Sequence, residues 1–313
     1  MIISIGVLDE ELSKNKIIFD FNSNKKLKTN LENIVYLDTN MALLKTINLY
    51  GKNKIGKSKI LEDIYIIKEQ FNFDKVMIDK NLSFFIKFTD NIIDIYEYEI
   101  EFNNKKVIKE ILKINDKLIY LIDKSTLINL NIHNISKESL NRYSNLFKEE
   151  YKKIFIKDNY NNSHIFIKSV FSYFISKEIS NKILNVINNI SIYLDDNKIN
   201  KYEKIDHINF EINNSKDDNK LILIDNIENG ININDIYKSF NNNINGNNTQ
   251  LLLTAYNPLL YKEDILREDQ IYFLTKNKSQ NIYLVNLLQY KNKLKIRFTK
   301  TKNFTYYFLN NYF

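Results

Sequence analysis

Apolar residues in the first part of the chain follow the pattern of β-strands. Short β-prone runs occur at residues 2–5, 17–21 and 33–37, with Asn-rich turns after the first two. A meander follows over residues 84–123, and within it residues 93–102 alternate apolar and charged side chains almost throughout. This alternation predicts a strand with one buried face and one face in water.

Helical spacing appears in two other places. Residues 60–67 predict a helix that runs to about residue 70. No glycine or proline interrupts residues 136–200, which predict a helical insert with its aromatic side chains in a core or against a partner helix. The apolar positions at helical spacing in this insert are Phe166, Val170, Phe174, Ile179, Ile183 and Val186.

Strand character returns in the last third of the chain. The predicted strands are residues 221–224, 250–254, 270–274 and 282–285, and the first is an unbroken apolar run that ends in Asp225. A carboxylate at the carboxyl end of a buried parallel strand can hold the Mg²⁺ of a bound nucleotide, the arrangement called Walker B. A buried strand that ends in a polar turn gives the same pattern, so this interpretation depends on a phosphate-binding loop elsewhere.

Residues 51–58 supply that loop, because they read Gly-Lys-Asn-Lys-Ile-Gly-Lys-Ser. They lie between the apolar run 47–50 and the predicted helix, which is the strand, glycine loop and helix order of a Walker A motif. The chain has 5 glycines in 313 residues, and two of them are in this motif at the required spacing. The predicted nucleotide-binding residues are Gly51, Asn53, Gly56, Lys57, Ser58 and Lys59.

The chemistry of phosphate binding explains these residue types. A glycine-bent loop lets backbone N–H groups face phosphate oxygens, and the N-terminus of the following helix adds the positive end of its dipole. Lys57 is expected to reach the β- and γ-phosphates. ATP and Mg²⁺ are therefore the predicted ligands, with Ser58 and Asp225 as the metal ligands.

Composition narrows the remaining classes of protein. Cysteine is absent, which excludes disulfides, thiolate zinc sites and cysteine nucleophiles, and His133, His164 and His207 show no metal-ligand spacing. No apolar run of about 18 residues occurs, and the N-terminus lacks the basic start of a signal peptide. We therefore expect a cytoplasmic protein without membrane association.

The net charge is +7, from 45 basic and 38 acidic residues. This balance permits an anionic partner, but no dense basic block is present. Lys, Asn, Ile and Tyr are abundant along the whole chain. The codon usage of an AT-rich genome accounts for this composition better than a nucleic-acid-binding patch does.

Taken together, several segments resemble the AbiL/RloA-type abortive-infection ATPases, AAA-family ATP/GTP phosphatases whose heads are related to the ABC-type ATPases of RecF, SMC and OLD proteins. The resemblance covers most of residues 1–123 and 220–313 and is loose between them. The matching segments are residues 43–51 at the loop, 98–112 in the meander, 223–228 (D-E-x-E in the family), 249–257 (Q-L-x-x-T-T-H), 266–273 (L-R-x-D-Q-I-x-F) and 307–312 (Y-L-x-G-R-Y/F).

The resemblance implies an α/β fold of the P-loop NTPase type. It predicts an ABC-type ATPase head built from N- and C-terminal segments, plus a helical insert. The expected parts are residues 1–130 with the phosphate loop and the meander, residues 131–205 as the insert, and residues 206–313 with Walker B.

Departures from the family pattern affect its catalytic residues. Asn226 replaces the Walker B glutamate that polarises the attacking water, and an amide cannot take a proton from that water. Tyr256 replaces the switch histidine of the family. The signature Ser-x-Gly is reduced to Ser215 without a following glycine. Glu228 is left as a candidate base, at a different offset from Asp225.

These residues leave three hypotheses about function. The first is a nucleotide-binding protein, a degenerate or slow ATPase, that regulates or scaffolds a phage-defence complex. The second is an active ATPase sensor that controls an effector nuclease or toxin. The third is a structural subunit that no longer binds nucleotide, because the bulky Lys54 and Ile55 stand where small residues usually let the backbone approach phosphate.

The resemblance also bears on partners. Related heads form dimers in which ATP lies between the loop of one chain and the signature of the other, which implies a homodimer. Since the signature is degraded, a heteromeric complex with an effector protein is the alternative. The charge of +7 would tolerate nucleic acid in such a complex.

Overall fold

The computed structural model divides the chain into two compact units, each considered by itself. The loop unit comprises Met1–Ile3, Leu12–Glu62 and Asn189–Phe313, and the meander unit comprises Ser4–Glu11 and Asp63–Asn188. The predicted division at residues 1–130, 131–205 and 206–313 stays a prediction. The structure describes residues 1–38, 41–90, 94–123, 126–130, 165–168, 177–194, 220–228, 249–261, 265–277, 281–295 and 303–309.

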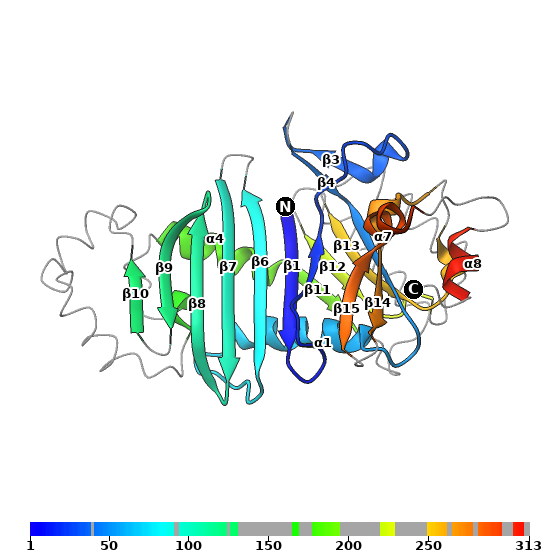
Figure 1. Ribbon diagram of the computed structural model, residues 1–313. Coiled ribbons are helices and arrows are strands. Elements are labelled where there is room, and N and C mark those ends of the chain that lie inside the picture. The colour runs from blue at the N-terminus through cyan, green and yellow to red at the C-terminus, as the bar shows by residue number, and fades with distance from the viewer. Residues whose placement is uncertain are drawn as a thin grey trace, which may run out of the picture. The chain divides into compact units, whose positions relative to one another are not determined.

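The loop unit is built on a six-stranded sheet in the order β11-β12-β13-β5-β14-β15 (Figure 1). Its first five strands are parallel, and only β15 runs antiparallel to its neighbour. The central strands β12, β13 and β5 are buried at every residue, as expected for parallel strands covered on both faces. The strands are β11 (Ile190–Tyr193), β12 (Leu221–Ile224), β13 (Gln250–Ala255), β5 (Thr46–Tyr50), β14 (Ile271–Lys276) and β15 (Ile282–Asn286).

Strand β5 comes from the N-terminal part of the chain, and both of its neighbours come from the C-terminal part. Leu49 pairs with Thr254 of β13, and Asn48 pairs with Ile271 of β14. This pairing confirms the predicted α/β fold of the P-loop type, in which N- and C-terminal segments share one sheet. It also brings the carboxyl ends of β5, β12 and β13 to the same edge.

The meander unit is an antiparallel sheet in the order β10-β9-β8-β7-β6-β1. The alternation predicted for β7 is confirmed, because Tyr96 and Tyr98 are buried while Glu99 and Glu101 on the other face pair with Lys109. The strands are β1 (Ile2–Asp9), β6 (Leu82–Asp90), β7 (Asp94–Asn103), β8 (Lys106–Ile114), β9 (Lys117–Asp123) and β10 (Thr126–Leu130).

The helices agree with the sequence in part. α1 (Lys57–Gln70) ends where the pattern placed its end, and α4 (Lys177–Asn188) confirms the helical spacing around Ile183. The prediction of a helical segment up to residue 200 is wrong at β11, a strand of the parallel sheet. Among the described residues, no helix is both long and apolar enough to cross a membrane.

The sequence did not predict several short elements. These are β4 (Ala42–Leu44), which forms a hairpin with β3 (Ile34–Tyr36) in the predicted run 33–37, and the helices α7 (Leu287–Leu294) and α8 (Phe304–Leu309). The N-terminal segment also contains β2 (Ile17–Asp20), as predicted. Single 3₁₀ turns occur at Leu31–Asn33, Phe166–Lys168, Pro258–Leu260 and Glu268–Gln270.

A fully buried arginine explains the L-R-x-D-Q-I segment. The Arg267 guanidinium donates from Nε and Nη2 to the Asp269 carboxylate, both at 2.9 Å. It also donates to the carbonyl oxygens of Thr29 at 2.8 Å and Asn24 at 3.2 Å. The planar guanidinium therefore fixes the N-terminal loop around residues 24–29 against the start of β14.

Arg267→Ala should destabilise the loop unit by about 3–5 kcal/mol, because it leaves the Asp269 carboxylate buried without its cation. The midpoint of urea unfolding measures this loss. Lys291→Ala is the control, since it breaks the ion pair with Glu268, which is more exposed to solvent, and should cost less than about 1 kcal/mol. Equal losses for the two variants would contradict the structural role of Arg267.

Candidate functional site

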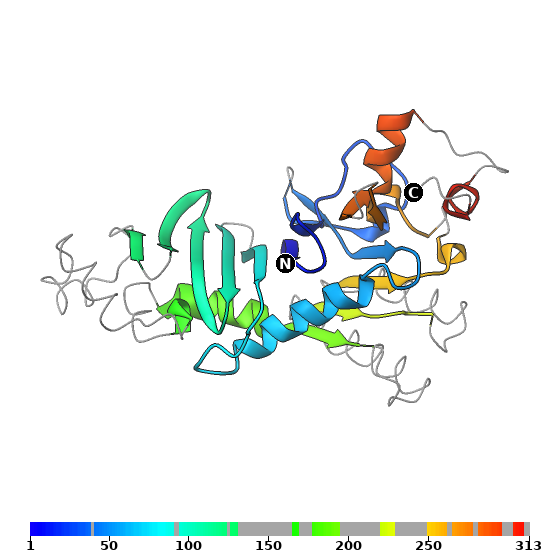
Figure 2. The ribbon, with the colours of Figure 1, turned by 60° about the horizontal axis from the view of Figure 1, so that its bottom comes forward.

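The phosphate loop has the predicted strand, loop and helix order. Strand β5 ends at Tyr50, and α1 begins at Lys57. Figure 2 shows the short loop that joins the end of β5 to the start of α1. Of the predicted binding residues outside the glycines and Lys57, Asn53 is exposed, and Ser58 and Lys59 are half-buried in the first turn of the helix.

Side-chain atoms lie close to both glycines of the loop. Gly56 has φ +112°, a conformation that side chains rarely adopt, and a Cβ there would lie 2.5 Å from Cδ1 of Leu12. A Cβ on Gly51 would lie 2.9 Å from Cγ2 of Ile55. The loop is therefore shaped by packing from the N-terminal segment as well as by its own sequence.

The side chain of Lys57 folds back onto the phosphate loop. Its side-chain ammonium donates to the carbonyl oxygens of Gly51 at 2.6 Å and Lys52 at 3.2 Å, and the residue is 5% exposed. Burial lowers the pKa of the Lys57 ammonium, and the negative charges of Glu228 and Asp225 oppose that change. The charge of Lys57 is thus influenced by two carboxylates of the Walker B segment.

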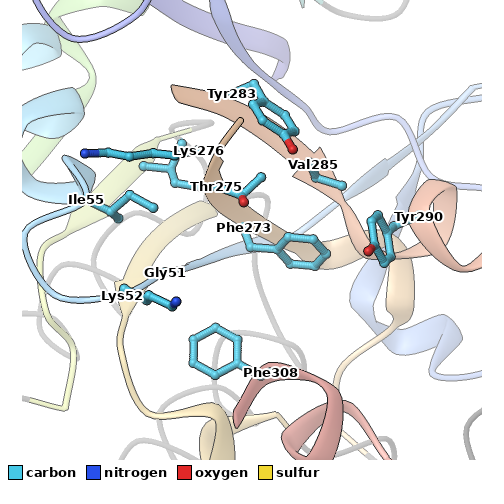
Figure 3. Close-up of a pocket in the computed structure, with 11 residues that line it drawn as sticks. Gly51, Lys52, Ile55, Phe273, Thr275, Lys276, Tyr283, Val285, Tyr290 and Phe308 are labelled. Atoms are coloured by element: carbon cyan, nitrogen blue, oxygen red, sulfur yellow. The ribbon is translucent and has the colours of Figure 1, made fainter. Parts of the chain in front are cut away.

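The two bulky residues of the loop, Lys54 and Ile55, differ in their exposure to solvent. Lys54 is exposed and has φ +61°, a strained value for a residue with a Cβ. Ile55 is buried and lines a pocket beside β14 (Figure 3). The loop therefore carries local strain at Lys54 in addition to the required glycine at Gly56.

Asp225 is fixed at the carboxyl end of β12. It is 3% exposed, and its Oδ1 accepts a 2.6 Å hydrogen bond from the Thr254 hydroxyl of β13. The same hydroxyl accepts a 2.7 Å hydrogen bond from the backbone N–H of Asn226. Thr254 was not predicted as a site residue, and its only signal is a hydroxyl near the end of an apolar strand.

Asn226 stands in the left-handed backbone region, with φ 44°. Asparagine is enriched in that region relative to other residues with a side chain. Its side-chain Nδ2 lies 3.5 Å from Oδ2 of Asp225. The asparagine at this position therefore suits the local backbone conformation.

Glu228 and the end of β13 are tied together. Oε1 of Glu228 accepts hydrogen bonds from the backbone N–H groups of Tyr256 and, at 3.3 Å, Asn257. Burial raises the pKa of the Glu228 carboxyl, and these hydrogen bonds and the charge of Lys57 oppose the rise. The Tyr256 side chain itself is 47% exposed.

The structure thus gathers four of the predicted residues, Lys57, Asp225, Asn226 and Glu228, around the carboxyl edge of the sheet. Ser215 and the degraded signature lie outside the described residues. Within the described ranges, no group of three or more His, Asp or Glu side chains is arranged to hold a metal ion. A metal at this site would therefore depend on oxygen atoms of the nucleotide as well as on Asp225 and Ser58.

A pocket of about 450 Å³ begins at the phosphate loop (Figure 3). Gly51, Lys52 and Ile55 form one wall, and β14, β15, α7 and α8 supply the others. The sequence did not predict this pocket, because its aromatic side chains come from four elements that meet only in the folded chain. These aromatic residues are Phe273, Tyr283, Tyr290 and Phe308.

Comparisons with known proteins give structural likeness alone. No protein-family model matches the chain, and no curated protein matches it. The SMC head domain from Thermotoga maritima is similar with a TM-score of 0.40 and 10% identity, over 91% of this chain and 98% of that one. An SMC head bound to the C-winged helix domain of ScpA gives 0.41 and 10%, over 94% and 99%. The fold assignment therefore rests on the sheet order and the phosphate loop of this chain.

Glu228→Gln should raise the melting temperature at pH 8 and raise it less at pH 5. A carboxyl whose folded pKa is raised loses stability as pH rises past its unfolded pKa of about 4.3, whereas glutamine has no such loss and keeps an acceptor oxygen. Thermal unfolding of both proteins across this pH range measures the difference. Glu62→Gln, at an exposed site, controls for the loss of one charge. A constant difference between pH 5 and 8 would contradict the prediction.

Proposed function

We propose that the chain binds a nucleoside triphosphate, ATP in the first instance, with its phosphates in residues 51–58. The observation that carries this proposal is the loop itself. Its two glycines leave no room for a Cβ, and its lysine ammonium is held at the loop's own carbonyl oxygens. Such a loop at a helix N-terminus is a site for phosphate oxygens.

The residues present also suit Mg²⁺. The Ser58 hydroxyl and the Asp225 carboxylate are hard oxygen ligands of the kind that Mg²⁺ prefers beside nucleotide phosphates. Thr254 fixes one oxygen of Asp225 through its hydroxyl. Bound Mg²⁺ would neutralise charge on the phosphate oxygens, while Lys57 would contribute its own positive charge to the same oxygens.

The pocket in Figure 3 supports a nucleotide rather than a phosphate ion. Its volume and aromatic walls fit a nucleoside, because bases stack on aromatic side chains. Lys52 lines the pocket and also belongs to the phosphate loop, so the two parts of the site are continuous. We propose that the base and ribose of the bound nucleotide occupy this pocket.

The biological role is proposed from the resemblance to the AbiL/RloA-type ATPases. Asn226 and Tyr256 replace the two residues that the family uses for rapid hydrolysis. We infer a slow or degenerate ATPase that acts as a regulatory subunit in phage defence, as a homodimer or with an effector protein. Nucleotide binding would then signal the state of the complex, and this role does not need rapid ATP hydrolysis.

Lys57→Ala should weaken binding of Mg²⁺–ATP by about 10- to 150-fold, because it removes charge-assisted hydrogen bonds to phosphate. Calorimetric titration measures the affinity, and thermal unfolding without nucleotide shows whether the variant is folded. Lys26→Ala removes the same charge from an exposed position and should bind as wild type does. A wild-type protein that binds no nucleotide would favour the structural-subunit hypothesis instead.

Tyr283→Ala should weaken ATP binding by about 5- to 100-fold, the equivalent of one lost aromatic stack. Its affinity for inorganic triphosphate should not change, because that ligand has no base. Tyr283 is partly exposed on the outer strand β15, so the substitution spares the core. Tyr36→Ala, at an exposed tyrosine that does not line this pocket, is the matched control. Equal affinities of wild type for ATP and triphosphate would exclude the nucleoside pocket.

A further inference from the structure

One oxygen of Glu228 has no hydrogen-bond partner among the described residues. Oε1 ties down the backbone N–H groups of Tyr256 and Asn257, whereas Oε2 is buried and, in the described part of the chain, accepts no hydrogen bond. Leaving a buried polar atom unsatisfied costs about 1–3 kcal/mol, and more for a charged group. Such an atom in a native protein calls for an explanation.

A structural role at the end of β13 accounts for only one of the two oxygens of the Glu228 carboxylate. Oε1 alone makes both hydrogen bonds to the end of β13, and a glutamine would make them without burying a charge. The second oxygen is therefore not explained by the fold. Glu228 follows β12, whose carboxyl end lies at the same edge of the parallel sheet as the end of β5, where the phosphate loop begins. The charges of Lys57 and Glu228 also act on each other.

The neighbouring Asn226 cannot do the same work. Its side-chain amide has no basic atom, and its Nδ2 lies 3.5 Å from the Asp225 carboxylate. Its backbone N–H is engaged by the Thr254 hydroxyl. Asn226 is thus directed towards the metal-binding carboxylate, and Glu228 is the only carboxylate of this segment with a free buried oxygen among the described residues.

We propose that Glu228 is the catalytic residue that orients and deprotonates the water for ATP hydrolysis, in place of Asn226. This inference rests on the proposed nucleotide binding at residues 51–58. The water oxygen forms a bond to the γ-phosphorus, and one water proton passes to Oε2 of Glu228. The bond between the γ-phosphorus and the bridging oxygen breaks, and its electron pair leaves with ADP.

The surroundings of Glu228 suit this task. Two backbone N–H groups hold Oε1, and this restricts the rotation of the carboxylate and so fixes the position of Oε2. Burial raises the pKa of this carboxyl, which makes it a stronger base than an exposed glutamate. The site therefore keeps a base although the usual Walker B position has lost it.

The test compares Glu228→Gln with wild type in the full chain, using Mg²⁺–ATP as the probe. Phosphate release should fall by about 10²- to 10⁴-fold, the range for loss of a general base. A second readout is equilibrium affinity, because removal of a negative charge near the γ-phosphate should raise the affinity for ATP relative to ADP. A role in loop structure alone would change the two affinities equally.

Two further variants sharpen the result. Glu62→Gln removes an exposed carboxylate from α1 and should keep wild-type turnover. Asn226→Ala should lower turnover far less than Glu228→Gln does, and the reverse order would overturn the proposal. Full turnover by Glu228→Gln would also overturn it, and so would tight ATP binding by wild type without any hydrolysis. In both of these last outcomes the proposed nucleotide binding stands, whereas absence of binding would remove both proposals.

Discussion

The loop unit depends on the hydrogen bonds that hold β5 between strands that follow it by about 200 residues. The fully buried amide of Gln250 exchanges hydrogen bonds with the backbone N–H and carbonyl of Ile2, at 2.7 and 2.8 Å. On the other side, Gln270 donates to the carbonyl of Thr46 at 2.9 Å. Both amides satisfy backbone groups that would otherwise be buried without partners. Gln270 thereby fixes β5 in the parallel sheet, and Gln250 fixes the first residues of the chain against β13.

This arrangement places the chemistry of the site. Because β12, β13 and β5 are parallel and in register, Asp225, Thr254 and the start of the phosphate loop reach the same edge. The hydroxyl of Thr254 then links β13 to both Asp225 and Asn226. The residues of the L-R-x-D-Q-I segment contribute differently. Arg267 and Gln270 bind backbone groups at residues 24–29 and at Thr46, and none of their hydrogen bonds in the described residues goes to the loop from 51 to 58. A motif that suggests a family therefore need not mark its active site.

The sequence predicted most strands and the loop because their signals are local. Alternation in β7 and the glycine spacing at 51–58 can be read without knowing what packs against them. Strand β11 was missed because four residues after an uninterrupted helical pattern carry too little periodicity to mark a change. Helix α7 was missed because its N-cap, Asn286, is also the last residue of β15. The Asn286 side chain accepts hydrogen bonds from the backbone N–H groups of Leu288 and Gln289.

At the candidate site, too, the sequence showed local motifs but not the contacts between distant residues. Lys57 and Asp225 could be named from their motifs, but the contact of Leu12 with Gly56 and the tie between Glu228 and β13 join residues far apart in sequence. Asn226 indicated lost catalysis, and Glu228 was left as a candidate base whose offset from Asp225 could not be judged from the sequence. In three dimensions that position adopts a left-handed backbone suited to asparagine, and the buried carboxylate lies two residues further on. A change of residue at one motif position therefore says little about catalysis until the acidic side chains near that position in the folded chain are known.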